Sequence, residues 1–261
     1  MQSKRIAGLL VVVSAVLAIA NPTPGSAANP VDIIFASDFL SGSALQWVRR
    51  HPQAGGASIA LAPARVSAVK LSNGDADMML YLQVPPALNH ETGYPAFSAL
   101  KTFGPSNPSS PVIGDCVIAR GTITLDHGAT ELSPATITAA ADNDCGGSPL
   151  TAYLTTVADV ATITADNQPG PLAESLESVL ITLNPVNVLG TPEPESFRVV
   201  DPGGAFNPPA LYVIPILYAF SPNPGAHLQI TGVYDEADHT APAMIWYQLL
   251  PRGASDIVVL P

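Results

Sequence analysis

Two Asp-His pairs are the places in the sequence where neighbouring side chains could combine to do chemistry. Asp126-His127 and Asp238-His239 each fall at the tip of a predicted β-hairpin. A carboxylate beside an imidazole can hold a divalent ion or respond to acid pH. The alternative is that both pairs are turn residues in water, because Asp is favoured in turns by its own hydrogen bonding. We favour the turn interpretation and keep a metal site as the second hypothesis.

A third group of oxygen ligands, Asp142-Asn143-Asp144, lies in a turn-rich segment. Alternating carboxylate and amide oxygens suit a hard cation such as calcium. No acidic ligand follows at the fixed spacing of a calcium-binding loop, so a solvated loop is the favoured alternative. The candidate metal ligands are therefore Asp126, His127, Asp142, Asp144, Asp238 and His239.

Residues 1–28 have the pattern of a cleaved signal peptide. Lys4 and Arg5 form a basic start, residues 6–20 are apolar, and small residues near position 28 suit cleavage. Prolines follow the apolar run where a membrane anchor would need a stop-transfer flank. We expect a secreted or periplasmic protein that is not inserted in a membrane after cleavage.

In an exported chain, Cys116 and Cys145 are expected to form one structural disulfide. The bridge would close a loop of about 30 residues and stabilise the fold by about 3 to 4 kcal/mol. A metal pair or a reactive thiol is the alternative. Two widely spaced cysteines without a histidine partner give little support to a metal site.

Composition indicates β-structure and an acidic surface. The chain has 27 prolines, and its charged fraction of 12% is about half the usual ~25%. Many prolines and β-branched residues favour short strands and turns. Cleavage removes Lys4 and Arg5, which leaves 8 basic residues against 21 acidic ones and moves the formal charge from −11 to −13. Such a surface disfavours phosphate backbones, so we do not expect nucleic acid as a partner.

Two predicted hairpins organise the chain. The stretches 114–137 and 225–257 each begin with two glycines at the same spacing and reach a leucine–proline step before a final isoleucine. We interpret them as matching hairpins, with Gly121 and Gly232 at matching points of the first strand. A glycine inside a strand marks a bulge, a sharp bend or a close backbone approach.

These hairpins predict an all-β fold of two tandem five-stranded OB-like barrels, or small β-sandwiches, after the signal peptide. A strand is expected to open the second module over 176–183, and Pro215 is expected to interrupt the apolar run 211–220. The predicted divisions are a lead-in (29–56) with a first strand near 31–39, a first module (57–140), a connector (141–171) and a second module (172–261).

The residues also resemble a module of exported bacterial proteins. The segments Leu176-Glu-Ser-Val-Leu-Ile-Thr-Leu, Thr231-Gly-Val and Leu250-Pro-Arg-Gly-Ala-Ser-Asp-Ile are similar to Tyr-Glu-Gly-Val-Leu-Val-Thr-Val, Ile-Thr-Gly-Val and Leu-Pro-Arg-Ser-Ala-Ala-Asp-Ile of that module. Ser178 stands where the module usually has Gly, and Gly253 where it usually has Ser. In the first half, Gly114-Asp-Cys-Val-Ile-Ala-Arg-Gly-Thr-Ile resembles the companion module.

The resemblance implies OB-like barrels of the kind that flank the catalytic domain in some extracellular endonuclease/exonuclease/phosphatase-type nucleases. Such modules also occur alone. In OB-type grooves, stacked aromatic rings and a basic channel bind single strands. Packing in the core is the favoured alternative here, since Arg198 and Arg252 are the cations that the second module offers. The aromatic candidates are Tyr212, Tyr218, Trp246 and Tyr247.

No catalytic motif accompanies these modules. The sequence has no Gly-x-Ser-x-Gly elbow, no His-Glu-x-x-His and no phosphate-binding glycine loop. We therefore expect an exported, non-catalytic binding or structural protein of the bacterial periplasm, surface or medium. No cofactor is expected, and the partner would be an unidentified protein or polymer. The alternative is an accessory component that binds nucleic acid or another polymer for a secreted enzyme, and a small hydrolase with an unrecognised site is a third class.

Overall fold

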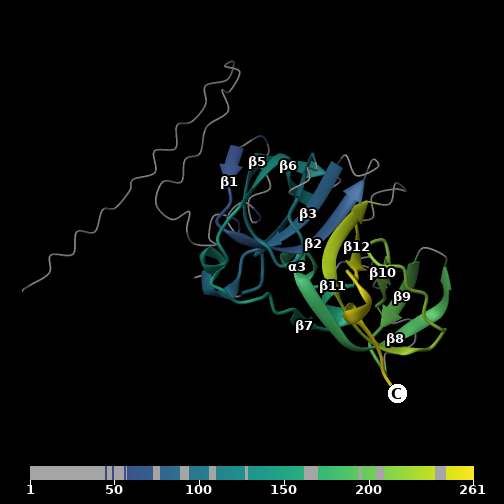
Figure 1. Ribbon diagram of the computed structural model, residues 1–261. Helices are drawn as coiled ribbons and strands as arrows, with labels where there is room; N and C mark the ends of the chain where they lie inside the picture. Colours follow the sequence, from purple (N-terminus) through teal and green to yellow (C-terminus); the bar gives the residue numbers. More distant parts are fainter. Residues whose placement is uncertain are drawn as a thin grey trace, which may run out of the picture. The chain divides into compact units, whose positions relative to one another are not determined.

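Figure 1 shows the computed structural model of the chain, which contains two separate units, 1–31 and 32–261. The predicted signal peptide and most of the lead-in, including the strand expected near 31–39, lie outside the described residues. All that follows concerns the second unit. The structure describes residues 45, 49, 56, 58–72, 77–88, 94–105, 110–126, 129–161, 170–193, 196–203, 209–238 and 245–261.

The first sheet closes into a five-stranded barrel with a sixth strand outside it. Its order is β1-β5-β2-β3-β4-β6, and an additional β5–β6 pairing closes the ring of β2 to β6. Pairing is antiparallel except between β4 and β6. The strands are β1 (Ser58–Ala60), β2 (Ala64–Ser72), β3 (Asp77–Gln83), β4 (Ala99–Pro105), β5 (Cys116–Asp126) and β6 (Ala129–Ala139).

The second sheet has the order β13-β11-β12-β10-β9-β8-β7, and a β11–β8 pairing closes the ring of β8 to β12. Its one parallel pair within the ring, β10–β12, occupies the place of β4–β6 in the first ring. The prediction of an all-β chain with OB-like barrels is confirmed. The strands are β7 (Tyr153–Thr155), β8 (Leu180–Glu193), β9 (Ser196–Val200), β10 (Leu211–Val213), β11 (His227–Asp238), β12 (Ile245–Leu250) and β13 (Ile257–Val259).

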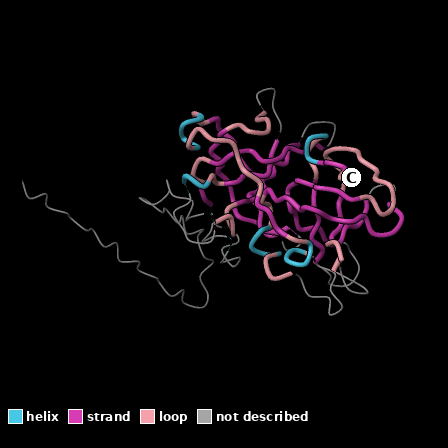
Figure 2. The backbone as a smooth tube through the Cα atoms, turned by 90° about the horizontal axis from the view of Figure 1, so that it is seen from below, coloured by secondary structure: helices cyan, strands magenta, loops and turns pink. Residues whose placement is uncertain are grey.

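Only short helical segments join these strands within the described residues, as Figure 2 shows in cyan. None of them has the length and apolar character needed to cross a bilayer. They are η2 (Pro86–Leu88), η3 (Asp142–Cys145), α2 (Val157–Val160), α3 (Ala173–Leu176) and η4 (Ala254–Asp256).

Each barrel buries its own apolar core, and a third apolar cluster joins the two. Leu80, Leu100 and Ile123 are fully buried in the first core, and Phe197 and Leu249 are buried in the second. Each such side chain contributes about 1.5 to 3 kcal/mol when it leaves water. The joining cluster combines Ala68 and Tyr81 of the first sheet with Leu180, Val233 and Leu250 of the second.

Two local expectations differ from the structure. The strand expected from residue 176 begins at Leu180, because α3 ends at Leu176 and Ser178 has a φ of 66°, outside the extended region. The segment 141–171, expected as a connector, contains the edge strand β7, which pairs in parallel with β8, and the short helix α2. In the lead-in, Leu45 and Arg49 are helical. The run before Pro215 was expected to be an edge strand or a bulge, but β10, which ends at Val213, pairs on both sides, with β9 and β12; Pro215 lies beyond the strand and removes no donor from it.

Gly121 in β5 and Gly232 in β11 both lie close to the backbone of the leucine–proline step that follows each of them in the sequence. A Cβ added to Gly121 would lie 2.4 Å from the Pro134 oxygen, and one added to Gly232 would lie 2.7 Å from the Leu250 oxygen. Real Cβ atoms do not approach backbone atoms this closely. Both glycines are therefore required by close approach to a neighbouring strand.

We predict that Gly121→Val and Gly232→Val each lower the free energy of unfolding by more than the ~1 kcal/mol typical of a point mutation. Valine suits strands in general, so the loss would come from the backbone contact alone. Thermal melts of both variants provide the measurement. Gly253→Val is the matched control, because a Cβ there meets nothing within 4 Å. If both variants have the same Tm as this control, the prediction is wrong.

Ser178 is fully buried, has a left-handed backbone, and its hydroxyl has no hydrogen-bond partner among the described residues. A non-glycine residue in this conformation costs about 1 to 2 kcal/mol, and glycine has no such cost. We predict that Ser178→Gly raises Tm. Ser178→Ala, which removes the hydroxyl but keeps the strained φ, should raise it less. If the glycine variant melts at or below the parent temperature, strain at this position is not a cost to the fold.

Candidate functional site

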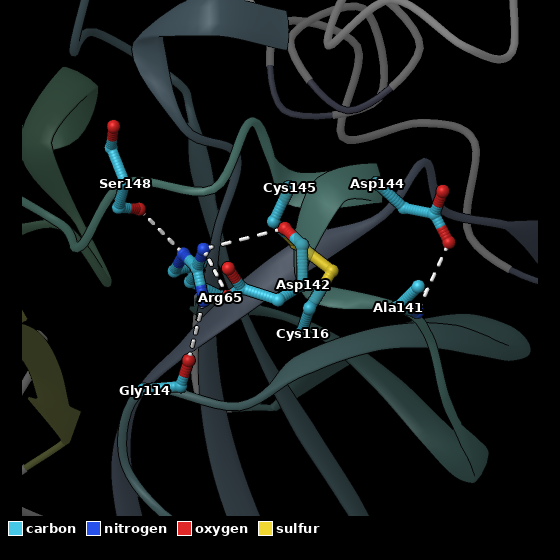
Figure 3. Close-up of a disulfide and its surroundings, with 8 residues drawn as sticks. All are labelled: Arg65, Gly114, Cys116, Ala141, Asp142, Asp144, Cys145 and Ser148. Carbon is cyan, nitrogen blue, oxygen red and sulfur yellow. Dashed lines mark hydrogen bonds and ion pairs between the residues drawn. A yellow bond between two sulfur atoms is a disulfide. The ribbon is translucent and has the colours of Figure 1, made fainter.

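Cys116 and Cys145 form the predicted disulfide, with an S–S distance of 2.04 Å and a Cα–Cα distance of 5.9 Å (Figure 3). Cys116 begins β5, and Cys145 ends η3, which follows β6. The bridge therefore fastens the segment after the first barrel to the barrel itself.

Arg65 of β2 reinforces the same region (Figure 3). Its Nε donates to the Ser148 oxygen at 2.7 Å, and its Nη1 donates to the Gly114 oxygen at 2.8 Å. Its Nη2 lies 2.6 Å from Oδ1 of Asp142. Oδ2 of Asp144 accepts a hydrogen bond from the Ala141 amide at 3.0 Å. Asp142 and Asp144 thus make contacts of their own, and the calcium hypothesis for this loop stays a prediction.

The structure does not describe the side chains of the two Asp-His pairs. Asp126 and Asp238 end β5 and β11, as the predicted hairpins require. Their side chains, and all of His127 and His239, lie outside the described residues. A metal site at either tip stays a prediction.

The aromatic candidates occupy different environments. Tyr247 is buried, as expected for core packing, and its ring stacks on that of Tyr234 with centroids 5.1 Å apart. Tyr212 and Tyr218 are half-buried, and Trp246 lies on β12 with its side chain outside the described residues. A binding surface formed by the four rings stays a prediction.

Tyr247 leads to a site that the sequence did not reveal. Its hydroxyl donates to Oε2 of Glu174 at 3.0 Å. Glu174 belongs with Glu177 and Glu236 to a cluster in which one oxygen of each carboxylate lies within 4.8 Å of the others. Glu177 and Glu236 are buried, whereas 61% of the Glu174 side chain is exposed. We call these three residues the carboxylate cluster.

Local backbone geometry positions the carboxylate cluster. Glu174 lies on α3, and the left-handed turn at Ser178 brings the chain from α3 into β8. The Ser178 amide donates to the Tyr234 oxygen at 2.5 Å, and the Tyr234 amide donates to the Val179 oxygen at 2.9 Å. This pair of bonds fixes α3 beside β11, which carries Glu236 two residues later.

Arg49 is the cation of the cluster. Its Nη1 lies 2.5 Å from Oε2 of Glu177, and its Nη2 donates to the Glu174 main-chain oxygen at 3.0 Å. The guanidinium is buried, and Nη2 is 4.0 Å from Oε1 of Glu174. One positive charge thus faces three carboxylates. Among the described residues, Oε1 of Glu177 and Oε1 of Glu236 have no hydrogen-bond donor.

A second buried polar group lies next to the cluster and crosses between the barrels. The Tyr81 hydroxyl of β3 donates to Oδ2 of Asp235 in β11 at 2.8 Å. Nζ of Lys101 lies 3.9 Å from Oδ1 of Asp235. Oε1 of Gln83 accepts a hydrogen bond from the Leu180 amide at 3.0 Å. Each contact pairs a strand of the first barrel with a strand of the second.

Burial dominates the acid–base behaviour of these carboxyls. It raises the pKa of Glu177 to about 7, although the Arg49 charge and hydrogen bond act to lower it. The pKa of Glu236 rises to about 8, first through burial and then through the negative charges of Glu177 and Glu174. Burial also raises the pKa of Asp235, against the lowering effects of Lys101 and Tyr81. Such groups can hold a proton near neutral pH or bind a cation.

In the sequence, Glu174, Glu177, Asp235 and Glu236 stand out only as negative charge. One feature of the sequence could have indicated a buried acid. Asp235 and Glu236 are adjacent acids inside a strand, so one of them must point to the buried face, where ionised side chains need partners. No comparable feature of the sequence indicated that Arg49 would contact these acids.

No family model and no curated protein matches the chain. Among solved structures, one described as "Molecular basis for abrogation of activation of pro-inflammatory cytokines" is 9% identical, with a TM-score of 0.30 and coverage of 79% of this chain and 94% of that one. A replication protein A heterotrimer bound to ssDNA is 10% identical, with a TM-score of 0.28 and coverage of 80% and 50%. A murine DNA-binding protein bound with ds DNA is 8% identical, with a TM-score of 0.29 and coverage of 77% and 93%.

The expectation against nucleic acid as a partner is corrected. It rested on the net charge alone, which averages the whole surface and does not describe any local part of it. Two of the similar structures are of proteins bound to DNA. A likeness at these TM-scores does not assign a ligand to this chain. Nucleic acid is therefore again one of the candidate partner classes.

We predict that stability falls as pH rises through the range in which the cluster ionises. Glu177 and Glu236 have pKa values of about 7 and 8, above the ordinary value of 4.5, so the folded state binds more protons than the unfolded state between these limits. The free energy of unfolding therefore decreases from about pH 5 to about pH 8. Thermal melts in EDTA across this range give the slope.

Glu236→Gln keeps this side chain neutral at every pH, so its Tm should decline less steeply than that of the parent. Asp144→Asn, which alters an exposed carboxylate, is the control and should keep the parental slope. Equal slopes for all three proteins would show that Glu236 does not titrate in the predicted range.

Proposed function

We propose that the protein is an exported, non-catalytic binding protein whose two OB-like barrels act as one fixed unit. The observation that carries the proposal is the buried polar contact between the barrels, above all the hydrogen bond from Tyr81 to Asp235. Nη1 of Arg252, beyond the second ring, also donates to the Ser67 oxygen of β2 at 3.1 Å. Separating the barrels would break these contacts and expose the apolar cluster that joins them.

The energetics support a fixed arrangement. Removing one partner of a buried ion pair costs about 3 to 5 kcal/mol, because the other charge remains buried without compensation. Asp235 and Lys101 are both about 95% buried, at 5% exposure each. A hinge between the barrels would have to leave these groups unpaired, so the barrels are expected to present their outer surfaces together.

The same contacts support a binding role over a catalytic one. Both cysteines are joined to each other, and Arg49, Arg65, Arg252 and Lys101 each pair with a carboxylate. The cysteines and these basic side chains are thus occupied in holding segments together. A catalytic site needs a nucleophile and a base that both reach a substrate.

Export is supported by two features. The basic and apolar start of the sequence has the pattern of a signal peptide. The disulfide suits an oxidising compartment, since cytosolic thiols are kept reduced. The partner is a protein or a polymer outside the cytoplasm. A role as an accessory module for a secreted enzyme, as the sequence resemblance implies, is one form of this proposal.

Expression of the full chain in a Gram-negative host tests export and activity together. We expect the periplasmic fraction to contain a protein that begins near residue 29, with a mass that increases on reduction and alkylation. It should turn over no nuclease, phosphatase, esterase or peptidase substrate. Turnover that Glu177→Gln abolishes would make the protein an enzyme, and a full-length, reduced cytoplasmic product would exclude export.

The purified protein is then immobilised and exposed to single-stranded DNA, double-stranded DNA, RNA and envelope polysaccharide in biolayer interferometry. We expect saturable binding to one of these classes. Tyr81→Phe, which removes the hydroxyl that donates to Asp235 while keeping the ring, should weaken that binding if the two barrels must be held together. Binding to none of the four would favour a structural role.

A further inference from the structure

We propose that the carboxylate cluster of Glu174, Glu177 and Glu236 is a binding site for a hard divalent cation, calcium. The three side chains converge from α3, the turn after it and β11, so the site exists only in the folded protein. One oxygen of each lies within 4.8 Å of the others. The site does not depend on a partner of the barrels, and its cation would bind whether or not the proposed function is correct.

Two buried oxygens point to a missing ligand. Glu177 is 0% exposed and Glu236 is 5% exposed, yet Oε1 of each has no hydrogen-bond donor among the described residues. A buried acceptor without a donor costs roughly 1 to 3 kcal/mol, and more when it is charged. Native proteins rarely leave such groups unsatisfied. A cation between the carboxylates would satisfy both oxygens at once.

The charge balance points the same way. Arg49 is the cation that the described residues bring to the cluster, and its Nη1 and Nη2 already contact Glu177 and Glu174. When all three carboxyls are ionised, they and one guanidinium leave a charge of −2 in a largely buried space. A divalent cation would neutralise it, as buried charges require.

The ligand set favours calcium over magnesium. Calcium binds oxygens at 2.3–2.6 Å, so two ligands on opposite sides of it lie about 4.6 to 5.2 Å apart. Three oxygens within 4.8 Å of one another are therefore close enough to share one calcium ion. Magnesium holds its water ligands more strongly and is usually bound through one or two carboxylates, whereas this cluster offers three. Glu174, with 61% of its side chain exposed, leaves a route for the ion to enter.

Terbium luminescence tests the site directly, because Tb³⁺ replaces Ca²⁺ and is excited through nearby tyrosines. Tyr247 hydrogen-bonds to Glu174 and stacks on Tyr234, so it would lie beside the bound ion. Titration of the mature protein should give saturable luminescence that Ca²⁺ displaces at up to about 1 mM, the range of extracellular calcium modules. Calcium should also raise Tm.

Glu236→Gln and Glu174→Gln should each weaken Tb³⁺ binding at least tenfold and abolish the calcium-dependent rise in Tm. Glu174 is exposed, so its variant should fold even if the buried variant does not. Asp144→Asn is the matched control and should bind like the parent. If Asp144→Asn alone weakens binding, the ion belongs to the 142–144 loop and the proposal is wrong. The proposal would also be wrong if calcium did not reduce the terbium luminescence, or if calcium did not raise Tm.

Discussion

The burial of charge where the two barrels meet is the constraint on which the rest of the structure depends. Taking an ionised carboxylate out of water costs several kcal/mol unless a partner compensates. Glu177 and Asp235 are both buried there, and their partners come from distant parts of the chain, Arg49 for the first and Tyr81 and Lys101 for the second. The polar contacts therefore hold one arrangement of the barrels, together with the apolar cluster between them.

The segments outside the two rings serve the same arrangement. Leu45 packs in the core of the first barrel, and Arg49, one helical turn later, binds the acids of the second module. The described part of the segment between the barrels is held at two places. Cys145 holds its start, and the carboxylate of Asp201 accepts from the amides of Val157 and Ala158, each at 2.9 Å. The disulfide and these hydrogen bonds therefore limit the freedom of residues 145–158.

The fold was predictable from the sequence because its signals are local. Glycine and proline positions mark hairpins, and the crowded Gly121 and Gly232 were recognisable from their place inside strands. The carboxylate cluster was not predictable in the same way. Its ion pair joins Arg49 to Glu177 across 128 residues, and no periodicity connects two such positions. Ser178 is an intermediate case. The sequence shows that it stands where the similar module has glycine, but its left-handed backbone, which suits glycine, became visible only in the structure.

The carboxylate cluster lies at the edge of the second barrel's core. Tyr247, which donates to Glu174, and Leu176, next to Glu177, both belong to that core. Neutralising the cluster, by protons or by a cation, would therefore act on the contact between α3, β11 and Arg49 and on the core beside it. Arg49 connects that contact to the segment that carries Leu45. A change in proton or cation concentration would thus act on the junction of the barrels and on the second core together.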